Sequence, residues 1–205
     1  MSDPSIMSAT PQGFQPRSFE RLPVPARDAM NDAQRAAADA IIAGPRGAIF
    51  GPFVALLRCP RLMERIGATG EALRFEGQLP EAVRELIVLV VARETSNQFE
   101  WQTHAPLARR AGVDQHVVDA IADGRRPRGL DRAAEAAVEL AAGLMRRHGI
   151  SDATYADAVA AFGEAGVVEL TALVGYFNMV CWIMNVARTP GPAGSSELPL
   201  PAAPA

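Results

Sequence analysis

Three side chains with acid–base chemistry fall close together in the middle of the sequence: Glu85, Glu100 and His104. Glu100 and His104 are four residues apart, so on a helix they project from the same face, one turn from each other. Histidine changes charge near neutral pH, and a neighbouring carboxylate can exchange a proton with it. Glu85 begins the apolar run ELIVLVVA, where a charge is costly unless it has a partner. We therefore predict that these residues converge on one proton-transfer site.

Each of the three residues also has a structural interpretation. Glu85 and Glu100 lie early in predicted helices, where a carboxylate complements the positive end of the helix dipole. A buried His104 would be satisfied equally well by a hydrogen bond to a backbone carbonyl. Phe99 and Trp101 flank Glu100 and predict an enclosed setting that suits acid–base work. The catalytic interpretation therefore depends on the three residues acting together.

The same residues could also form a metal site of two carboxylates and one imidazole. Di-iron helical bundles, however, use paired Glu-x-x-His motifs, whereas the spacing here is Glu-x-x-x-His. The three histidines, His104, His116 and His148, show no zinc-type spacing. We therefore predict no metal site.

The composition excludes several classes of function. The formal net charge is −3, which gives no electrostatic basis for binding nucleic acid. The sequence contains no lysine, so Schiff-base chemistry and the phosphate-binding lysine of a P-loop are excluded. The two cysteines, Cys59 and Cys181, lie far apart, and we expect both to be buried free thiols rather than a redox pair.

The elements that must position these residues are predicted to be helices, because alanine is abundant and no period-two alternation is visible. The predicted helices span residues 31–42, 52–57, 60–75, 80–93, 97–112, 114–122, 131–148, 151–162 and 166–186. Pro80 is placed in the first turn of its helix, and Ser96 or Asn97 is expected to cap the next one. Pro106 lies inside that helix and predicts a kink or a local adjustment.

The two ends of the chain differ from its middle. Residues 1–30 and 189–205 are rich in proline and predict flexible tails around a single helical domain of residues 31–188. The N-terminal residues show no signal-peptide pattern, and no apolar run reaches membrane-spanning length, since Gly175 and Asn178 interrupt the longest one. We expect a cytoplasmic protein without a membrane partner.

Two of the predicted helices, residues 82–93 and 166–186, are apolar over more of their surface than one neighbour can cover. We therefore expect a homo-oligomer (a dimer, trimer or hexamer) in which a second copy completes their burial. The loop of residues 125–128 is strongly basic, and both a solvated connection and an anion-binding element remain open for it.

The stretch RELIVLVVARETSNQFEWQTHAPLARRAGV resembles the core motif of the carboxymuconolactone decarboxylase family, which also contains alkyl hydroperoxidase D. The segment ISDATYADAVAAFGEAGVVELTALVGYFNMVCWIMNVA resembles the C-terminal helical pair of the same family. Together with the preceding helices, the resemblance covers residues 30–190 and implies an all-α, alkyl hydroperoxidase D-like helical bundle.

The resemblance also implies a departure from the redox chemistry of that family. Its hydroperoxidase branch uses a glutamate, a CxxC pair and a histidine four residues after the second cysteine. The glutamate corresponds to Glu85 and the histidine to His104, but the cysteine positions hold Asn97 and Glu100. Thiol–disulfide chemistry needs two sulfurs, so peroxidase activity by that mechanism is excluded.

What remains resembles the decarboxylase branch, which works without metal or organic cofactor and acts in aromatic catabolism. Its type reaction removes carbon dioxide from a carboxylated unsaturated lactone. Glu100 or His104 would then protonate the resulting dienolate, and Glu85 would orient His104. Isomerisation or hydrolysis of a related enol or lactone would use the same residues. A non-catalytic binding or assembly protein is the alternative from another class.

Candidate substrate-binding residues surround these three. Phe99, Trp101 and Tyr176 are candidates for pocket walls, and Asn97 for a hydrogen bond to the substrate. Core packing is the competing interpretation for the aromatic residues, and helix capping for Asn97. The many arginines leave room for a small anionic or lactone substrate.

Overall fold

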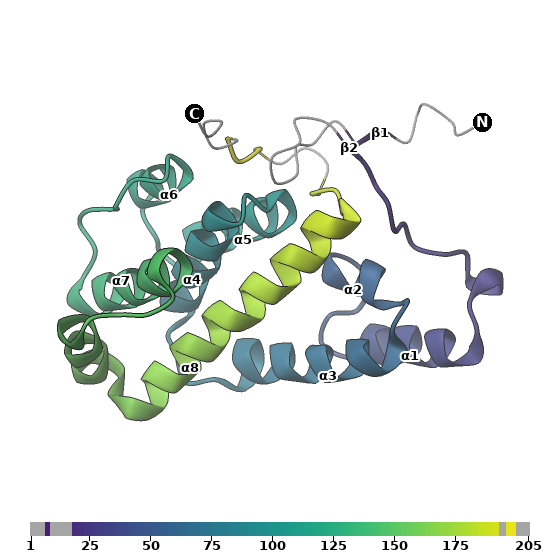
Figure 1. Ribbon diagram of the computed structural model, residues 1–205, viewed down its shortest axis with the longest axis horizontal. Helices are drawn as coiled ribbons and strands as arrows, with labels where there is room; N and C mark the ends of the chain where they lie inside the picture. The colour runs from purple at the N-terminus through teal and green to yellow at the C-terminus, as the bar shows by residue number, and fades with distance from the viewer. Residues whose placement is uncertain (1–6, 9–17, 193–195, 200–205) are drawn as a thin grey trace.

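The computed structural model describes residues 7–8, 18–192 and 196–199. In chain order its α-helices are α1 (Asp32–Ala43), α2 (Pro52–Leu56), α3 (Pro60–Glu71), α4 (Glu81–Glu94), α5 (Gln98–Arg110), α6 (Gln115–Ala122), α7 (Arg132–Arg147) and α8 (Asp152–Ala187) (Figure 1). The other elements are two short turns, Arg27–Ala29 (3-10) and Ala72–Glu76 (π), and a small antiparallel strand pair, β1 (Met7–Ser8) and β2 (Ser18–Phe19). The predicted all-α fold is confirmed.

Helix α4 forms the centre of the molecule. Every residue from Glu85 to Ala92 is buried, as expected for a helix that is apolar on nearly all faces. It packs against α5, α7 and α8, and α8 crosses the middle of the molecule with α1–α3 to one side of it (Figure 1). The central apolar helix therefore provides the dry surroundings in which Glu85 lies.

Side-chain caps fix where several helices begin, as the sequence predicts. Asn31 forms a complete capping box with Gln34, and Asn97, Asp131 and Ser151 each accept a hydrogen bond from a backbone N–H in the first turn. The prediction for Pro80 is wrong by one position. Pro80 is the N-cap residue of α4 and has an extended backbone, because α4 begins only at Glu81.

Helix α8 joins the two helices that the sequence predicts between residues 151 and 186. The break between them is confirmed at Gly163, whose φ of 68° is non-helical and is accessible to glycine at little cost. By length and composition this helix could cross a membrane, so the expectation that no apolar run reaches membrane-spanning length is wrong for α8. Half of its most apolar window is nevertheless buried inside the protein. A helix buried to this extent is typical of a globular core.

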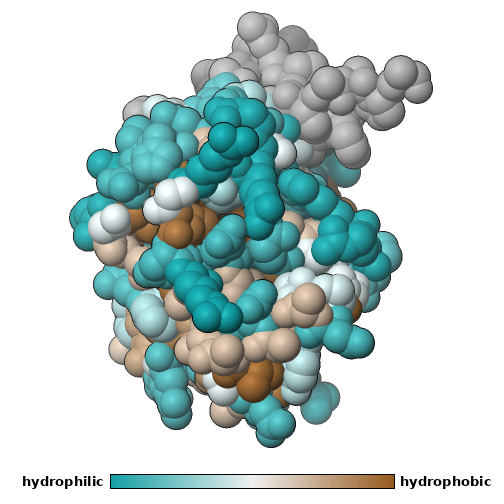
Figure 2. All heavy atoms as spheres, turned by 90° about the vertical axis from the view of Figure 1, so that its left-hand side faces the viewer, coloured by the Kyte–Doolittle hydropathy of each residue, from teal (hydrophilic) through white to brown (hydrophobic). Residues whose placement is uncertain are grey.

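The outward side of α8 is apolar and uncovered. Val168 is 69% exposed, Trp182 60% and Val186 64%, and these residues follow the three- and four-residue spacing of one helix face. By contrast, hydrophilic side chains predominate on the face of the molecule shown in Figure 2, where the most hydrophobic atoms form separate patches. Helix α8 thus carries a continuous exposed apolar face, in addition to single exposed apolar side chains elsewhere such as Phe19 and Phe75.

The described residues near both ends of the chain contact the helical domain. The Arg21 N–H donates to the carbonyl of Ala187. Leu198 is only 1% exposed, and its backbone exchanges two hydrogen bonds with the amide of Gln98 on α5. The remaining residues of both predicted tails lie outside the described part of the chain, so the flexibility of the tails stays a prediction.

Candidate active site

The turn between α4 and α5 determines where the three predicted catalytic residues lie. Glu85 lies in α4, and Glu100 and His104 lie on the first and second turns of α5. Asn97 fixes the start of α5, because its side-chain oxygen accepts a hydrogen bond from the Glu100 N–H at 2.8 Å. The Asn97 amide also donates to the carbonyl of Cys181 at 3.1 Å, which ties the turn to α8.

The predicted convergence of Glu85, Glu100 and His104 is confirmed. His104 Nδ1 lies 2.6 Å from Glu85 Oε2, and His104 Nε2 lies 3.1 Å from Glu100 Oε2. The exposed fractions are 2% for His104, 6% for Glu85 and 4% for Glu100. The edge of the imidazole also meets the ring of Phe177, with the ring centroids 5.4 Å apart. We call these three residues the triad.

The two carboxylates determine how readily His104 holds a proton. Burial alone would lower the pKa of His104, but the hydrogen bonds and the negative charges of Glu100 and Glu85 outweigh it, so its pKa is raised. The geometry agrees with this direction, because both ring nitrogens face an oxygen. The two carboxylates therefore stabilise the imidazolium relative to the neutral imidazole.

The protonation states of the triad are linked. A neutral imidazole has one N–H donor, so it can donate to only one of two flanking carboxylates. The other contact then requires a proton on a carboxyl group. In either arrangement the triad carries one net negative charge and one proton that can move between Glu100 and His104.

A small cavity adjoins the outer side of the triad. It has a volume of about 30 Å³, and it is lined by Glu100 and His104 but not by Glu85. Its other lining residues come from the segment before α2 and from α2, the π turn, α5 and α8: Arg46, Phe50, Pro52, Phe53, Arg74, Phe99, Thr103, Tyr176, Phe177 and Val180. Glu100 and His104 thus face the space that a ligand would occupy, and Glu85 lies behind them.

The four predicted substrate-binding residues separate into two groups. Phe99 and Tyr176 line the cavity. Asn97 does not, since its side chain caps α5 and bonds to Asn185 at 2.9 Å, and it is fully buried. Trp101 does not either; it lies beside a groove that α5 and α6 form with residues 196–199. The predictions that Trp101 forms a wall of this pocket and that Asn97 hydrogen-bonds the substrate are therefore corrected, and helix capping accounts for Asn97.

Two arginines at the cavity are functional candidates that the sequence analysis did not identify. Arg46 precedes α2, and Arg74 lies in the π turn, so both reach the cavity from segments outside the α4–α5 motif. One signal in the sequence could have drawn attention to Arg46: it lies in the glycine-rich segment GPRGAIFG, where close backbone approach is common. Nothing comparable marks Arg74.

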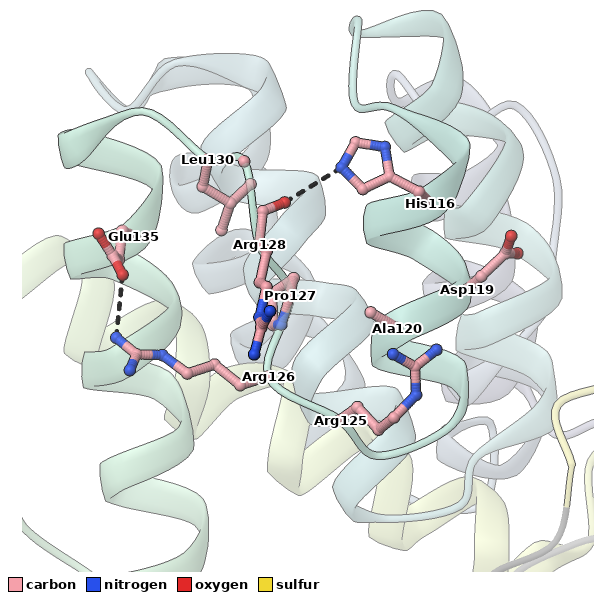
Figure 3. A pocket seen from close by; sticks show the side chains of 10 residues that line it. His116, Asp119, Ala120, Arg125, Arg126, Pro127, Arg128, Leu130 and Glu135 are labelled. Atoms are coloured by element: carbon pink, nitrogen blue, oxygen red, sulfur yellow. Dashed lines mark hydrogen bonds and ion pairs between the residues drawn. The ribbon is translucent and has the colours of Figure 1, made fainter.

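A much larger hollow, which we call the groove at the basic loop, surrounds residues 125–128. It has a volume of about 850 Å³ and is lined on opposite sides by His116 and Glu135 (Figure 3). Arg126 forms ion pairs with Glu135 at 2.9 Å and with Glu139 at 2.6 Å, and Arg125 pairs with Asp123 at 2.8 Å. These pairs are solvent-exposed and mutually neutralising, as in a solvated connection.

The cysteines and the metal alternative can be assessed from the same geometry. Cys181 is fully buried, and burial raises the pKa of its thiol, which keeps it inert. Cys59 is exposed, so the expectation that both thiols are buried is wrong for it. The two carboxylates of the triad lie at different edges of the His104 ring and cannot converge on one cation with it. Within the described ranges, no group of three or more His, Cys, Asp or Glu residues could hold a metal ion.

Comparisons with known proteins agree with this architecture. The family model described as "Carboxymuconolactone decarboxylase family" matches residues 60–143, which run from α3 to α7. No curated protein sequence matches the chain significantly.

Several solved structures share the fold. The alkylhydroperoxidase AhpD core of an uncharacterized peroxidase-related protein from Ralstonia eutropha JMP134 is 19% identical, with a TM-score of 0.69 over 84% of this chain and 92% of that one. A peroxidase-related protein from Silicibacter sp. TM1040 is 18% identical, with a TM-score of 0.68 over 85% and 92%.

The debrominase Bmp8, with a C82A substitution and in complex with 2,3,4-tribromopyrrole, is 12% identical, with a TM-score of 0.65 over 86% and 93%. At these identities the structural matches show the fold alone. The match to the family model is a match of sequence, and its residues 60–143 include the triad. Residues 60–143 of this chain match the model of the carboxymuconolactone decarboxylase family, and the chain has the alkyl hydroperoxidase D-like fold without a CxxC pair.

Proposed function

We propose that this protein is a cofactor-independent decarboxylase that acts on a small carboxylated lactone or a similar resonance-stabilised acid. The observation that carries the proposal is the buried imidazole held between two carboxylates, one of which faces a cavity. The two positions at which the redox branch has sulfur hold Asn97 and Glu100, so the chemistry left to this site is proton transfer.

The proposed reaction needs only one proton from the protein. The bond between the substrate carboxylate and its carbon breaks, carbon dioxide leaves, and the electron pair moves into the conjugated lactone to give a dienolate. A proton from the triad then forms the new C–H bond, and solvent returns a proton to the triad. Placing the donor and the apolar walls in advance is what the site contributes.

We assign the proton donor to Glu100. Both ring nitrogens of His104 are occupied by carboxylate oxygens, so neither N–H is directed at the cavity. Glu100 both lines the cavity and contacts Nε2, so it can pass a proton to a ligand and receive one from His104. Glu85 is a positioning residue, because it holds Nδ1 from behind and does not reach the cavity.

The decisive experiment is a screen of muconolactone-type and β-keto acids for release of carbon dioxide. The wild-type protein, Glu100→Gln and His104→Ala would be compared with His116→Ala, whose imidazole lies in the basic loop region. The proposal expects release by the wild type and by His116→Ala only. Turnover that persists in Glu100→Gln would contradict the assignment of the donor.

Two alternative functions, isomerisation or hydrolysis and non-catalytic binding, are distinguished by the same screen. Isomerisation or hydrolysis of a related enol or lactone would use the same proton relay, and the screen detects it as product formation without carbon dioxide. The debrominase with this fold was crystallised with 2,3,4-tribromopyrrole, a small unsaturated ring, which supports a planar ligand for the cavity. A non-catalytic binding protein would show ligand binding but no turnover with any acid tested.

The homo-oligomer and the cytoplasmic location stay predictions. The uncovered face of α8 runs from the small residues Ala172 and Gly175 to the bulky Met179 and Trp182. A second copy packed antiparallel would lay the bulky side chains of each helix over the small ones of the other. Light scattering should show that Trp182→Glu lowers the molecular mass of the particle in solution, because the oligomer dissociates. Tyr155→Glu, at another exposed position, should leave this mass unchanged.

A further inference from the structure

The two arginines at the cavity are in different electrostatic states. The guanidinium of Arg46 is buried, with a side chain only 3% exposed, and it pairs with Glu71 at 2.5 Å. It also donates to the carbonyl of Gly67 at 3.2 Å and lies 4.6 Å from the ring centroid of Phe53. Because its charge is neutralised and its position is held by these contacts, Arg46 serves as a wall of the cavity.

Arg74 has no such compensation. Among the described residues it forms no ion pair, and its guanidinium carbon lies 5.3 Å from the centroid of the Phe75 ring. It lies in the π turn Ala72–Glu76 and lines the cavity. Such π turns are rare and occur frequently at functional sites.

A second polar group at the cavity also lacks a partner. The hydroxyl oxygen of Thr103 is buried and makes no hydrogen bond to any described residue, although Thr103 lines the cavity. A buried hydroxyl without a partner is costly, and in native proteins it usually meets a water or a ligand. The cavity is large enough for one water, which would satisfy this group while no ligand is bound.

The position of Tyr176 links these groups to the triad. Burial raises the pKa of Tyr176, and the charge of Glu100 adds to this, while Arg46 and Arg74 act in the opposite direction. Tyr176 also hydrogen-bonds to Arg46, and it lines the cavity together with Glu100 and both arginines. Gly70 makes room for it, since a Cβ at that position would lie 2.1 Å from the hydroxyl oxygen.

We propose that Arg74 and Thr103 form an anion subsite that binds a carboxylate of the ligand and leaves its unsaturated body against Glu100. The uncompensated cation supplies the charge, and the unpaired hydroxyl supplies a hydrogen bond. The inference rests on the proposed function for the identity of the substrate, a small acid, but the subsite itself is testable without turnover.

Binding of a ligand larger than water requires the cavity to widen. Phe50 is at its mouth, 37% exposed, and stacks on Phe99 with ring centroids 6.3 Å apart. Gly51 follows with a φ of 57°, and a Cβ there would lie 2.6 Å from the Phe99 ring. Outward rotation of the exposed Phe50 ring would widen the cavity on this side.

The test uses benzoate as the anionic probe and benzamide as its neutral counterpart of the same shape. Binding to the full-length protein would be measured by calorimetry, and the His104 ring resonances would show whether the probe reaches the triad. We expect benzoate to bind more tightly than benzamide. Arg74→Gln should weaken benzoate binding by about 10- to 100-fold and Thr103→Val by about 2- to 10-fold, with benzamide binding little changed.

Arg65→Gln is the matched control, because Arg65 is an exposed arginine of α3 that does not line the cavity. The subsite is overturned if benzoate does not bind, if benzamide binds equally well, or if Arg74→Gln binds benzoate like Arg65→Gln. Benzoate binding that depends on Arg74, in a protein that decarboxylates no acid, would retain the subsite and reject the proposed function. If the wild type releases carbon dioxide and Arg74→Gln does so with an unchanged KM, the proposed function is retained and the subsite is rejected.

Discussion

The triad cavity and the groove at the basic loop contain similar residue types in opposite physical settings. Both are lined by one histidine, one glutamate and several arginines. The groove is about 850 Å³ in volume and its ion pairs are exposed, whereas the cavity is about 30 Å³ and its charges are buried. In the groove water screens each charge, while in the cavity each charge acts on its neighbour. Burial and pairing, rather than the size of a hollow, identify the reactive site.

The largest expected effect tests whether only one of the two histidines is catalytic. Removing the imidazole in His104→Ala interrupts the proton relay, and we expect the rate of the proposed reaction to fall by about 10²–10⁴-fold. His116→Ala in the groove should leave the rate unchanged. Steady-state kinetics on the first acid found to be turned over would measure both variants. An equal loss of rate in the two variants would contradict the assignment of catalysis to the triad alone.

The next effect concerns the stability contributed by a carboxylate in each region. Glu85→Gln removes one partner of a buried, hydrogen-bonded imidazolium, so the free energy of unfolding should fall by about 3 kcal/mol. Glu135→Gln removes one partner of an exposed pair and should cost less than about 1 kcal/mol. Urea unfolding monitored by circular dichroism measures both values, and a similar cost for the two substitutions would contradict the comparison.

Helix caps offer the same contrast at the level of local structure. Asn97→Ala at the start of α5 removes a fully buried cap with three hydrogen bonds and should cost about 2 kcal/mol of unfolding free energy. Asp131→Ala, at the start of α7 after the basic loop, should cost about 1 kcal/mol. In addition, only Asn97→Ala should reduce turnover, since it displaces Glu100. Thermal unfolding and kinetics on the same samples separate the two effects.

The pH dependence of stability should also originate in the triad. The pKa of His104 is raised on folding, so its contribution to stability is fully present below its unfolded pKa and is lost as pH rises through its folded pKa. Between about pH 6 and 8 the unfolding free energy of the wild type should therefore decline relative to that of His104→Gln. A difference that stays constant over this range would mean that the triad binds no extra proton in the folded state.

The smallest effect is expected for Arg126, the central residue of the groove. Arg126→Gln breaks two exposed ion pairs, and we expect a change of less than about 1 kcal/mol in unfolding free energy and no change in turnover. A marked loss of activity in this variant would favour the alternative that the basic loop binds an anionic ligand.

The convergence of the triad could be predicted from the sequence because its geometry is local. The four-residue spacing of Glu100 and His104 and the cap at Asn97 fix two members on one helix, and the apolar run of α4 supplies the third. The breaks between helices were predictable for the same reason, as at Gly163, where glycine accepts a backbone that other residues avoid.

The rest of the cavity could not be predicted, because it depends on contacts between segments distant in the sequence. Arg74 lies in the π turn that follows α3, and no residue pattern within that turn predicts its place at the cavity. The direction of Trp101 depends on how α5 packs against α6 and residues 196–199, which its position beside Glu100 does not reveal. Tertiary packing decided both cases.

The contrast between Cys59, which is exposed, and Cys181, which has no exposed surface, supplies two intrinsic reporters of conformation. A maleimide should modify the first sulfhydryl at once and the second only when α8 separates from the turn that carries Asn97. The rate of the slow phase of such labelling would report how often this part of the molecule opens, in the unmodified protein and without any dye or engineered probe.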